Sequence, residues 1–444
     1  MASIYALRAF VRRHKWWQNA VFFTGLVSLI TVFSVAFLGA DSAPRAVWTD
    51  QPLGRVDSPQ FAESLSHLVN APLERGGRVE VLDNGDGFLP ALLRDIRGAG
   101  ATINILVYVW EDGRMSDQVL DALLERQRGG VAVRVLVDGI GGDGAPDERF
   151  RALEQAGGRV ARYREASLGT WTRLHRRNHR RAIVIDSEVG FVGGMGISDQ
   201  WLGHAQDAEH WRDMMFRVTG PMARRLQAAF VGSWVSSSGE IVVQPPASAP
   251  APEAASADDD GVERFIHHLN SPADDDRSMA YFYLMPILAA RESIYLTTPY
   301  FIPDEPLKQA LRERAQAGVD VRLLVPGART DHLVTRFTGQ NAYATLLEAG
   351  VKIYEYGPTF IHSKVAVIDG RWSVIGSPNL NSRSRRLDEE NALAVLDRAL
   401  GRQLEQRFFA DVVRSSALDL DEWRRRGPLL RLIQFSARLI EQQS

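Results

Sequence analysis

Cysteine is absent from the 444-residue sequence, and acidic and basic residues nearly cancel, leaving a formal net charge of −2. The lack of cysteine excludes disulfides, thiolate metal sites and cysteine nucleophiles. The lack of a basic excess argues against a dedicated nucleic-acid-binding protein, so no nucleic-acid partner is expected. The chain is 45% hydrophobic and 24% charged, which is typical of globular proteins, and its length predicts two domains with appendages.

Charged residues are also missing from one long stretch near the N-terminus, residues 19–40. This stretch is rich in Val, Phe, Leu and Ile and is long enough to span a bilayer as a helix. Four Lys or Arg residues precede it between Arg8 and Lys15, and Asp41 follows it. This distribution predicts a single-pass anchor with a cytoplasmic N-terminus and the rest of the chain on the far side. A cleaved signal peptide is the alternative, and the length of the apolar run disfavours it.

The short pattern H-x-[K/R]-x4-D occurs twice. The two copies consist of His179, Arg181 and Asp186, and of His362, Lys364 and Asp369. Each copy leads through a short apolar run into a glycine turn, at Gly193 in the first copy and at Gly376 and Ser377 in the second. One short motif matches by chance, whereas two copies in the same context indicate a shared function.

The residues before each motif repeat one order: a strand, an amphipathic helix that ends at glycine, a second strand and a third strand-like run. In the first copy these are residues 103–109, 116–128, 131–137 and 158–163, and in the second they are 294–300, 305–317, 319–325 and 351–356. Alternation of this kind predicts an α/β sheet with helices on its faces. Its repetition predicts two copies of one domain.

These features predict a division of the chain into six parts. They are a basic stub with a transmembrane helix (1–40), a connecting segment (41–76), a first α/β/α domain (77–237), a linker rich in Pro, Ala, Ser and Asp (238–262), a second α/β/α domain (263–415) and a C-terminal segment (416–444). The C-terminal segment mixes arginines with apolar residues at helical spacing. We expect it either to lie on anionic lipid or to dock on the protein's own core.

Two histidines with two cations suit phosphoryl transfer. Residues two apart on a strand point to the same face, so each histidine is expected beside the cation of its own copy. One imidazole can attack phosphorus, forming a phosphohistidine, while the other protonates the leaving alkoxide and then deprotonates the acceptor. Arg181 and Lys364 would offset charge on the non-bridging oxygens, and no metal or cofactor is required. Asp186 and Asp369 should point to the opposite face, and we expect them to hold the local architecture.

These motifs resemble those of the phospholipase D superfamily, and within it the bacterial cardiolipin synthases. The resemblance extends from about Val79 to the C-terminus. It rests on residues 178–186, 193–195, 211–213 (Trp-Arg-Asp), 298–301 (Thr-Pro-Tyr-Phe), 361–364, 376–379 and 383–384, together with Glu390. It implies two phospholipase D-like α/β/α sandwich domains facing across a pseudo-twofold axis, with one shared active site. It also implies that one phosphatidylglycerol donates its phosphatidyl group to the enzyme and a second accepts it, giving cardiolipin and glycerol.

The resemblance also implies roles for single residues. His179 takes the place of the nucleophile and His362 that of the acid and base. An acidic residue some thirty positions after each histidine orients the imidazole in the family, and Asp213 and Glu390 occupy those places; such orientation has the logic of a catalytic-triad aspartate. The remaining motif residues are expected to bind phosphate, namely Asn379, Gly193, Gly376 and Ser377.

Two residues depart from the family pattern. Arg181 stands where the family has Lys, and Gly196 stands where Asn is expected. Arginine keeps the charge and can grip phosphate with two N–H groups, but it is longer and planar, so the exchange is not neutral. The loss of Asn removes one donor from the phosphate site.

Other functions stay open at this point. A hydrolytic phospholipase D would use the same histidines with water as the acceptor, and a nuclease of the superfamily is disfavoured by the slightly acidic charge. A non-enzymatic lipid-binding protein would account for the departures in the first motif. Phospholipid, with phosphatidylglycerol first, and a bacterial inner membrane are the expected partners, with the catalytic domains on the periplasmic side. The sequence predicts no oligomeric state.

Overall fold

A computed structural model describes residues 50–51, 53–164, 176–243, 262–271 and 277–427. All of them belong to one compact unit, Trp48–Ser444. The predicted transmembrane helix and most of the predicted linker lie outside these residues. Within the described ranges, no helix combines the length and the apolar character needed to cross a membrane.

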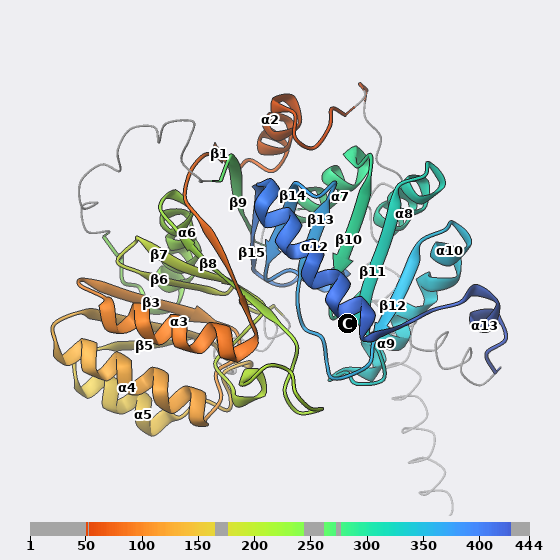
Figure 1. Ribbon diagram of the computed structural model, residues 1–444. Coiled ribbons are helices and arrows are strands. Elements are labelled where there is room, and N and C mark those ends of the chain that lie inside the picture. The colour runs from red at the N-terminus through yellow and green to blue at the C-terminus, as the bar shows by residue number, and fades with distance from the viewer. Residues whose placement is uncertain (1–49, 52, 165–175, 244–261, 272–276, 428–444) are drawn as a thin grey trace, which may run out of the picture. The chain divides into compact units, whose positions relative to one another are not determined.

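The first domain is built on a seven-stranded sheet with the order β2-β8-β7-β6-β3-β4-β5 (Figure 1). Its strands are β2 (Val79–Asp83), β3 (Thr102–Val107), β4 (Ala132–Asp138), β5 (Arg159–Tyr163), β6 (Ala182–Ile185), β7 (Val189–Gly193) and β8 (Met214–Thr219). Strands β3, β4 and β5 pair in parallel, and the other neighbours pair antiparallel.

The second domain is built on a nine-stranded sheet with the order β1-β9-β15-β14-β13-β10-β11-β12-β16. Its strands are β1 (Leu73–Glu74), β9 (Arg264–Asn270), β10 (Ser293–Thr297), β11 (Asp320–Pro326), β12 (Lys352–Tyr356), β13 (Val365–Ile368), β14 (Trp372–Gly376), β15 (Glu390–Leu396) and β16 (Ser415–Ala417). From β9 to β12 this order repeats the whole first sheet, which confirms the predicted two-domain α/β fold. The additional strands β1 and β16 lie at the two edges.

Helices cover the faces of both sheets. They are α2 (Pro59–Leu68), α3 (Asn84–Gly98), α4 (Arg114–Arg128), α5 (Asp147–Gln155), α6 (Pro221–Ser238), α7 (Ser278–Ala289), α8 (Glu305–Gln316), α9 (Leu333–Gly339), α10 (Tyr343–Glu348), α11 (Ser382–Arg386), α12 (Arg398–Val413) and α13 (Leu420–Arg424), with short 3₁₀ helices η2 (Asp199–Trp201) and η4 (Gln340–Ala342). Local signals set their ends. Asp304, for example, precedes α8 and its side chain accepts a hydrogen bond from Leu307 N, which satisfies a free amide of the first turn.

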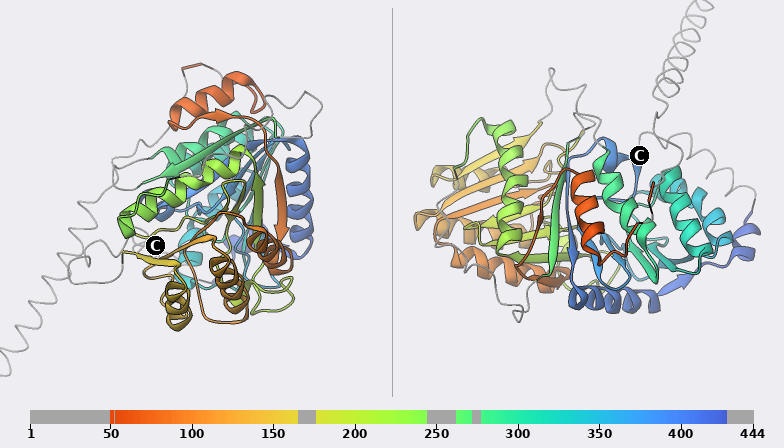
Figure 2. Two further views of the ribbon diagram at one scale, coloured as in Figure 1. Left: turned by 90° about the vertical axis from the view of Figure 1, so that its left-hand side faces the viewer. Right: turned by 90° about the horizontal axis from the view of Figure 1, so that it is seen from above.

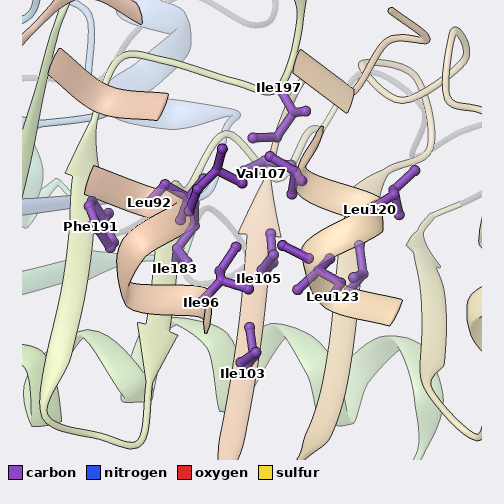
Figure 3. Packing of buried hydrophobic residues seen from close by; sticks show 14 of the residues in the cluster. Leu92, Ile96, Ile103, Ile105, Val107, Leu120, Leu123, Ile183, Phe191 and Ile197 are labelled. Atoms are coloured by element: carbon purple, nitrogen blue, oxygen red, sulfur yellow. The ribbon is translucent and has the colours of Figure 1, made fainter. Parts of the chain in front are cut away.

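Apolar cores on both faces of the sheets hold these layers together. Every second residue of β3, namely Ile103, Ile105 and Val107, points to the face covered by α3 and α4 (Figure 3). The core on the other face contains residues of both sheets, among them Phe216 of β8 and Ile375 of β14. Helix α6 of the first domain packs against β9 of the second, as the view from above shows (Figure 2). The two domains therefore share a core, which fixes the segments that meet between them.

Residues outside the two predicted α/β/α domains also contribute to the fold. The predicted connecting segment contains α2 and β1, and β1 pairs antiparallel with β9, with Leu73 opposite Ile266. Residues that precede the first domain in sequence thus complete the sheet of the second. At the other end, Trp423 of the predicted C-terminal segment packs on Tyr343 of α10, with 5.2 Å between the ring centres. This part of the segment docks on the protein, and residues 428–444 lie outside the described structure.

Candidate active site

The two histidine motifs lie where the domains meet, and each is hydrogen-bonded through its backbone to the opposite domain. The four bonds join His179 N to Glu389 O (2.9 Å), Glu389 N to Arg177 O (2.8 Å), His362 N to Arg212 O (2.7 Å) and Arg212 N to Phe360 O (2.9 Å). The second pair of bonds repeats the first at equivalent positions of the two copies. The histidines were predicted on strands, but β6 begins at Ala182 and β13 at Val365. They lie in the extended segments just before these strands, because these segments pair with the other domain.

The carboxylates that orient the histidines are exchanged between the domains. His179 Nδ1 lies 2.9 Å from Glu390 Oε1, and His362 Nδ1 lies 2.7 Å from Asp213 Oδ2. Each acidic residue follows the histidine of its own copy in sequence but binds the histidine of the other copy. Both carboxylates are fully buried. Each histidine therefore needs both domains for its orientation. The other ring nitrogen of each, Nε2, is not bound to a carboxylate.

Burial sets the protonation of the first histidine pair. Burial, with help from Arg181 and Lys364, lowers the pKa of His179 well below 6.5. Burial also raises the pKa of Glu390 to about 7. Both shifts have the same cause: burial disfavours the charged form of each group, which is the protonated form of the histidine and the deprotonated form of the glutamate. His179 is consequently a neutral imidazole at neutral pH, as a nucleophile must be.

In the second histidine pair the carboxyl is ionised at neutral pH. Burial, followed by the charge of Lys364, lowers the pKa of His362 to about 4. Burial opposes the charge of Asp213, but His362 and Lys364 outweigh it and hold the pKa of this carboxyl below its ordinary value. With Asp213 ionised, the ring of His362 donates from Nδ1, and its Nε2 lies 3.0 Å from Lys364 Nζ.

Two buried cations accompany the histidines. Arg181 Nη1 donates to His179 O at 2.7 Å, and Lys364 Nζ donates to His362 O at 2.6 Å. Burial lowers the pKa of Lys364 from 10.5 to about 7, and it also lowers the pKa of Arg181 below the ordinary value of a guanidinium. A guanidinium stays charged in spite of such a shift, so one cation of the site is permanent and the other can titrate. Arg181 Nε has no hydrogen-bond partner within the described part of the chain, which leaves it available to an anionic ligand.

The predicted phosphate-binding residues have different surroundings. The Ser377 hydroxyl donates to the Glu390 carboxylate, so it supports the carboxylate that orients His179. A Cβ atom on Gly193 would lie 2.7 Å from Met214 O, and one on Gly376 would lie 2.5 Å from Asn391 O. These two glycines are required by the close approach of neighbouring strands. Strand packing thus explains Gly193 and Gly376, and support of the Glu390 carboxylate explains Ser377. No bound phosphate is needed to explain any of the three.

Asn379 and Gly196, at equivalent positions of the two copies, differ for a steric reason. Asn379 is buried, and among the described residues its Oδ1 has no hydrogen-bond partner, so its amide is not used up by the protein. A Cβ atom on Gly196 would lie 2.6 Å from Val109 O and 3.2 Å from the ring of Trp201. The space that an asparagine side chain would need is occupied first by Val109 and then by the Trp201 ring, which explains the departure from the family pattern.

The motif aspartates bind backbone amides. The Asp186 carboxylate accepts hydrogen bonds from the N–H groups of residues 100–102, at 2.6 to 2.8 Å. The Asp369 carboxylate accepts from residues 291–293, at 2.8 to 3.1 Å. Both residues have positive φ angles, 52° and 51°. Each aspartate thus holds the start of the neighbouring strand, β3 or β10, and its oxygens do not contact a histidine.

Sequence reasoning missed the aromatic residues around the histidines. The ring of Tyr108 lies 5.0 Å from that of His179, and its hydroxyl is hydrogen-bonded by Arg177. Trp211 and Phe360 contact the ring of His362. The motif Trp-Arg-Asp was a signal for Trp211, whereas nothing in the sequence marked Tyr108. In the described ranges, no three His, Asp or Glu side chains are grouped so as to hold a metal ion.

Comparisons with known proteins agree with this geometry. The family model described as "Cardiolipin synthase, PLD-like domain" matches residues 92–234 and 283–412. Cardiolipin synthase A of Pseudomonas fluorescens (strain SBW25) is 33% identical over 399 residues, which cover 88% of this chain and 81% of that protein. Cardiolipin synthase of Halalkalibacterium halodurans is 32% identical over 384 residues, covering 86% and 75%. The crystal structure of phosphatidylserine synthase from Haemophilus influenzae Rd KW20 has a TM-score of 0.62 at 16% identity, covering 86% of this chain and 97% of that one, which shows a shared fold.

Proposed function

The chain belongs to the cardiolipin synthase family of phospholipase D-like proteins, and on this basis we propose that it is a phosphatidyltransferase that converts two molecules of phosphatidylglycerol into cardiolipin and glycerol. The observation that carries the proposal is the pair of buried histidines, each held at Nδ1 by a carboxylate from the other domain. This arrangement leaves Nε2 of both imidazoles unbound to a carboxylate, and we propose that both imidazoles and both cations act on one substrate phosphate.

In the first half-reaction, Nε2 of His179 attacks the phosphorus of the donor phosphatidylglycerol. A P–N bond forms, the bond from phosphorus to the glycerol oxygen breaks, and the departing alkoxide takes a proton from Nε2 of His362. Arg181 and Lys364 offset the charge on the non-bridging oxygens. The products are a phosphatidyl group on His179 and free glycerol.

In the second half-reaction, a glycerol hydroxyl of another phosphatidylglycerol attacks the same phosphorus. Its proton passes to Nε2 of His362, the bond from phosphorus to His179 breaks, and the electron pair returns to the imidazole. The product is cardiolipin, and both histidines are restored. The free energy of the phosphodiester is kept in the P–N bond, so the transfer needs no second energy source.

Substrate binding favours the protonated form of His362, which the first half-reaction requires. In the free protein, burial holds the pKa of His362 at about 4 and that of Lys364 at about 7. A phosphodiester adds negative charge beside both groups and so raises both pKa values. His362 therefore takes up a proton more readily when the donor is bound, while Lys364, whose Nζ lies 3.0 Å from His362 Nε2, keeps its own charge beside the phosphate.

The proposed cellular location is the bacterial inner membrane. The uncharged residues 19–40, preceded by basic residues, form the single-pass anchor, and the catalytic domains lie on the periplasmic side. Because the sequence has no cysteine, an introduced cysteine is the only thiol of the chain. In intact cells a membrane-impermeant maleimide should label Val413→Cys, whose position is exposed, and should not label Ala2→Cys. The reverse pattern would place the catalytic domains in the cytoplasm.

The enzymatic proposal is tested by expression in a bacterial host that lacks cardiolipin. Lipid mass spectrometry should find cardiolipin in cells that express the protein and none in cells that express His362→Ala at the same level. Purified protein with headgroup-labelled phosphatidylglycerol should release glycerol as cardiolipin appears. Phosphatidic acid as the sole lipid product would show that water is the acceptor and would reject the synthase.

A further inference from the structure

The two copies of the repeat differ at one matched pair of positions beside the histidines. Arg177 and Phe360 stand two residues before His179 and His362. Asp388 and Trp211 stand two residues before the carboxylates that bind these histidines. Because the backbone bonds of the two copies match, Arg177 with Asp388 beside His179 corresponds to Phe360 with Trp211 beside His362. Two residues with ionisable side chains in one half of the site are thus replaced by two aromatic residues in the other.

The half of the site around His179 is polar. Arg177 N donates to Asp388 Oδ1 at 3.3 Å, and the Arg177 guanidinium binds the Tyr108 hydroxyl. The guanidinium of Arg181 lies 5.6 Å from the centre of the Tyr108 ring. Cations next to His179 favour an anionic group at its Nε2, which suits the phosphatidyl intermediate.

The half of the site around His362 is aromatic. Four rings surround the imidazole, at centre-to-centre distances of 5.3 Å for Trp211, 5.6 Å for Phe360, 5.7 Å for Trp201 and 6.5 Å for Tyr300. We call this set the aromatic wall. Its members also contact one another, with 4.8 Å between the rings of Trp211 and Phe360 and 5.1 Å between those of Trp201 and Trp211.

Two polar atoms of the wall are occupied by protein groups. Trp201 Nε1 donates to Asp213 Oδ2 at 3.0 Å, and the Tyr300 hydroxyl donates to Asp331. Phe360 has no polar side-chain atom and is buried. Phe360 and the faces of the other three rings therefore offer apolar carbon to whatever approaches His362, and a water molecule against them would lose hydrogen bonds that it has in bulk.

We propose that the aromatic wall forms the acceptor site, and that Trp211 and Phe360 determine the choice of a lipid alcohol over water. The proposal rests on the function proposed above and names the residues that select its second substrate. The glycerol carbons of the acceptor pack on the rings, which places its hydroxyl against Nε2 of His362. The oxygen then bonds to phosphorus, its proton moves to His362, and the bond to His179 breaks. Water would follow the same steps and give phosphatidic acid, but it gains nothing from the rings.

The test is the partition of products made by the purified full chain from labelled phosphatidylglycerol. Trp211→Leu and Phe360→Leu should lower the ratio of cardiolipin to phosphatidic acid by roughly tenfold or more, because loss of apolar contact in a specificity pocket has effects of this size. Glycerol release, which reports the first half-reaction, should continue. Phe360→Tyr keeps the ring but adds a hydroxyl to the wall, and it should lower the ratio in the same direction even if the leucine variants fold poorly.

Matched controls come from rings outside the site. Trp423→Leu removes an indole that packs on Tyr343, and Phe409→Leu removes a ring that packs on Tyr295. Both should keep the wild-type ratio. Variants of the wall that lose both products together, with the ratio unchanged, would overturn the inference and leave the synthase function in place. A wild-type protein that releases no glycerol from phosphatidylglycerol would instead reject the proposed function.

Discussion

Replacement of Lys364 by methionine should abolish activity and at the same time stabilise the fold. The Lys364 side chain is almost fully buried, and burial lowers its pKa from 10.5 to about 7. At pH 7 this difference corresponds to at most about 4 kcal/mol of the free energy of folding. Its hydrogen bond to His362 O, 2.6 Å long, is lost in the variant, which costs about 1.5–3 kcal/mol. The net stabilisation of Lys364→Met at pH 7 is on the order of 1–2 kcal/mol.

The lowered pKa of Lys364 makes the stability difference between Lys364→Met and the wild type depend on pH. The unfolded chain holds the Lys364 proton up to pH 10.5, whereas the folded protein releases it near pH 7. The unfolded state therefore binds more protons between these values, and the penalty fades as the pH rises. The advantage of Lys364→Met should be largest at or below pH 7 and should shrink steadily toward pH 10.

Denaturant unfolding of both proteins at several pH values measures this difference. Lys352→Met is the matched control, because Lys352 is half exposed and pairs with Asp320 at 2.7 Å on the surface. This control should lose no more than about 1 kcal/mol at any pH. A Lys364→Met variant that is less stable than the wild type at pH 7, or whose difference does not change with pH, would refute the reasoning.

Three further predictions concern other groups of the site. Arg181→Lys should keep or raise the rate of cardiolipin formation, whereas Arg181→Ala should abolish it; equal high turnover in both would show that no cation is needed there. Asp369→Ala should reduce the free energy of unfolding by about 2–4 kcal/mol, since three backbone amides lose their acceptor, while activity per folded molecule persists. Glu390→Gln should slow turnover by roughly 10²–10⁴-fold and should shift the ring-nitrogen NMR signals of His179, 211 positions away in sequence, rather than those of His362. A shift confined to His362 would contradict the exchanged carboxylates.

The repeat was the part of the fold that the sequence could predict. Strand and helix patterns of the two copies match the observed elements to within a few residues, because apolar periodicity and glycine at helix ends act locally. Strand β1 could not be predicted in the same way. It has two residues, and its partner β9 is about 190 positions away, so only the folded sheet shows the pairing.

The site shows the same division between local and long-range information. The motif spacing identified both histidines and their cations. It could not show that Glu390 binds His179, because this contact joins different domains. The reason for Gly196 could not be predicted either, since Val109 and Trp201, which occupy the space of a larger side chain, approach it only in the folded protein. The aromatic wall is a further case: its four rings come from separate segments and meet only around His362.

The central claim is that His179 carries the phosphatidyl group while His362 transfers protons across the same phosphorus. Rapid mixing with phosphate-labelled phosphatidylglycerol, an alkaline quench and peptide mass spectrometry test it most directly. The account predicts a phosphatidyl adduct on the peptide that contains His179, absent in His179→Ala and formed far more slowly in His362→Ala. Cardiolipin formation by His179→Ala at the wild-type rate, or an adduct on any other residue, would contradict it.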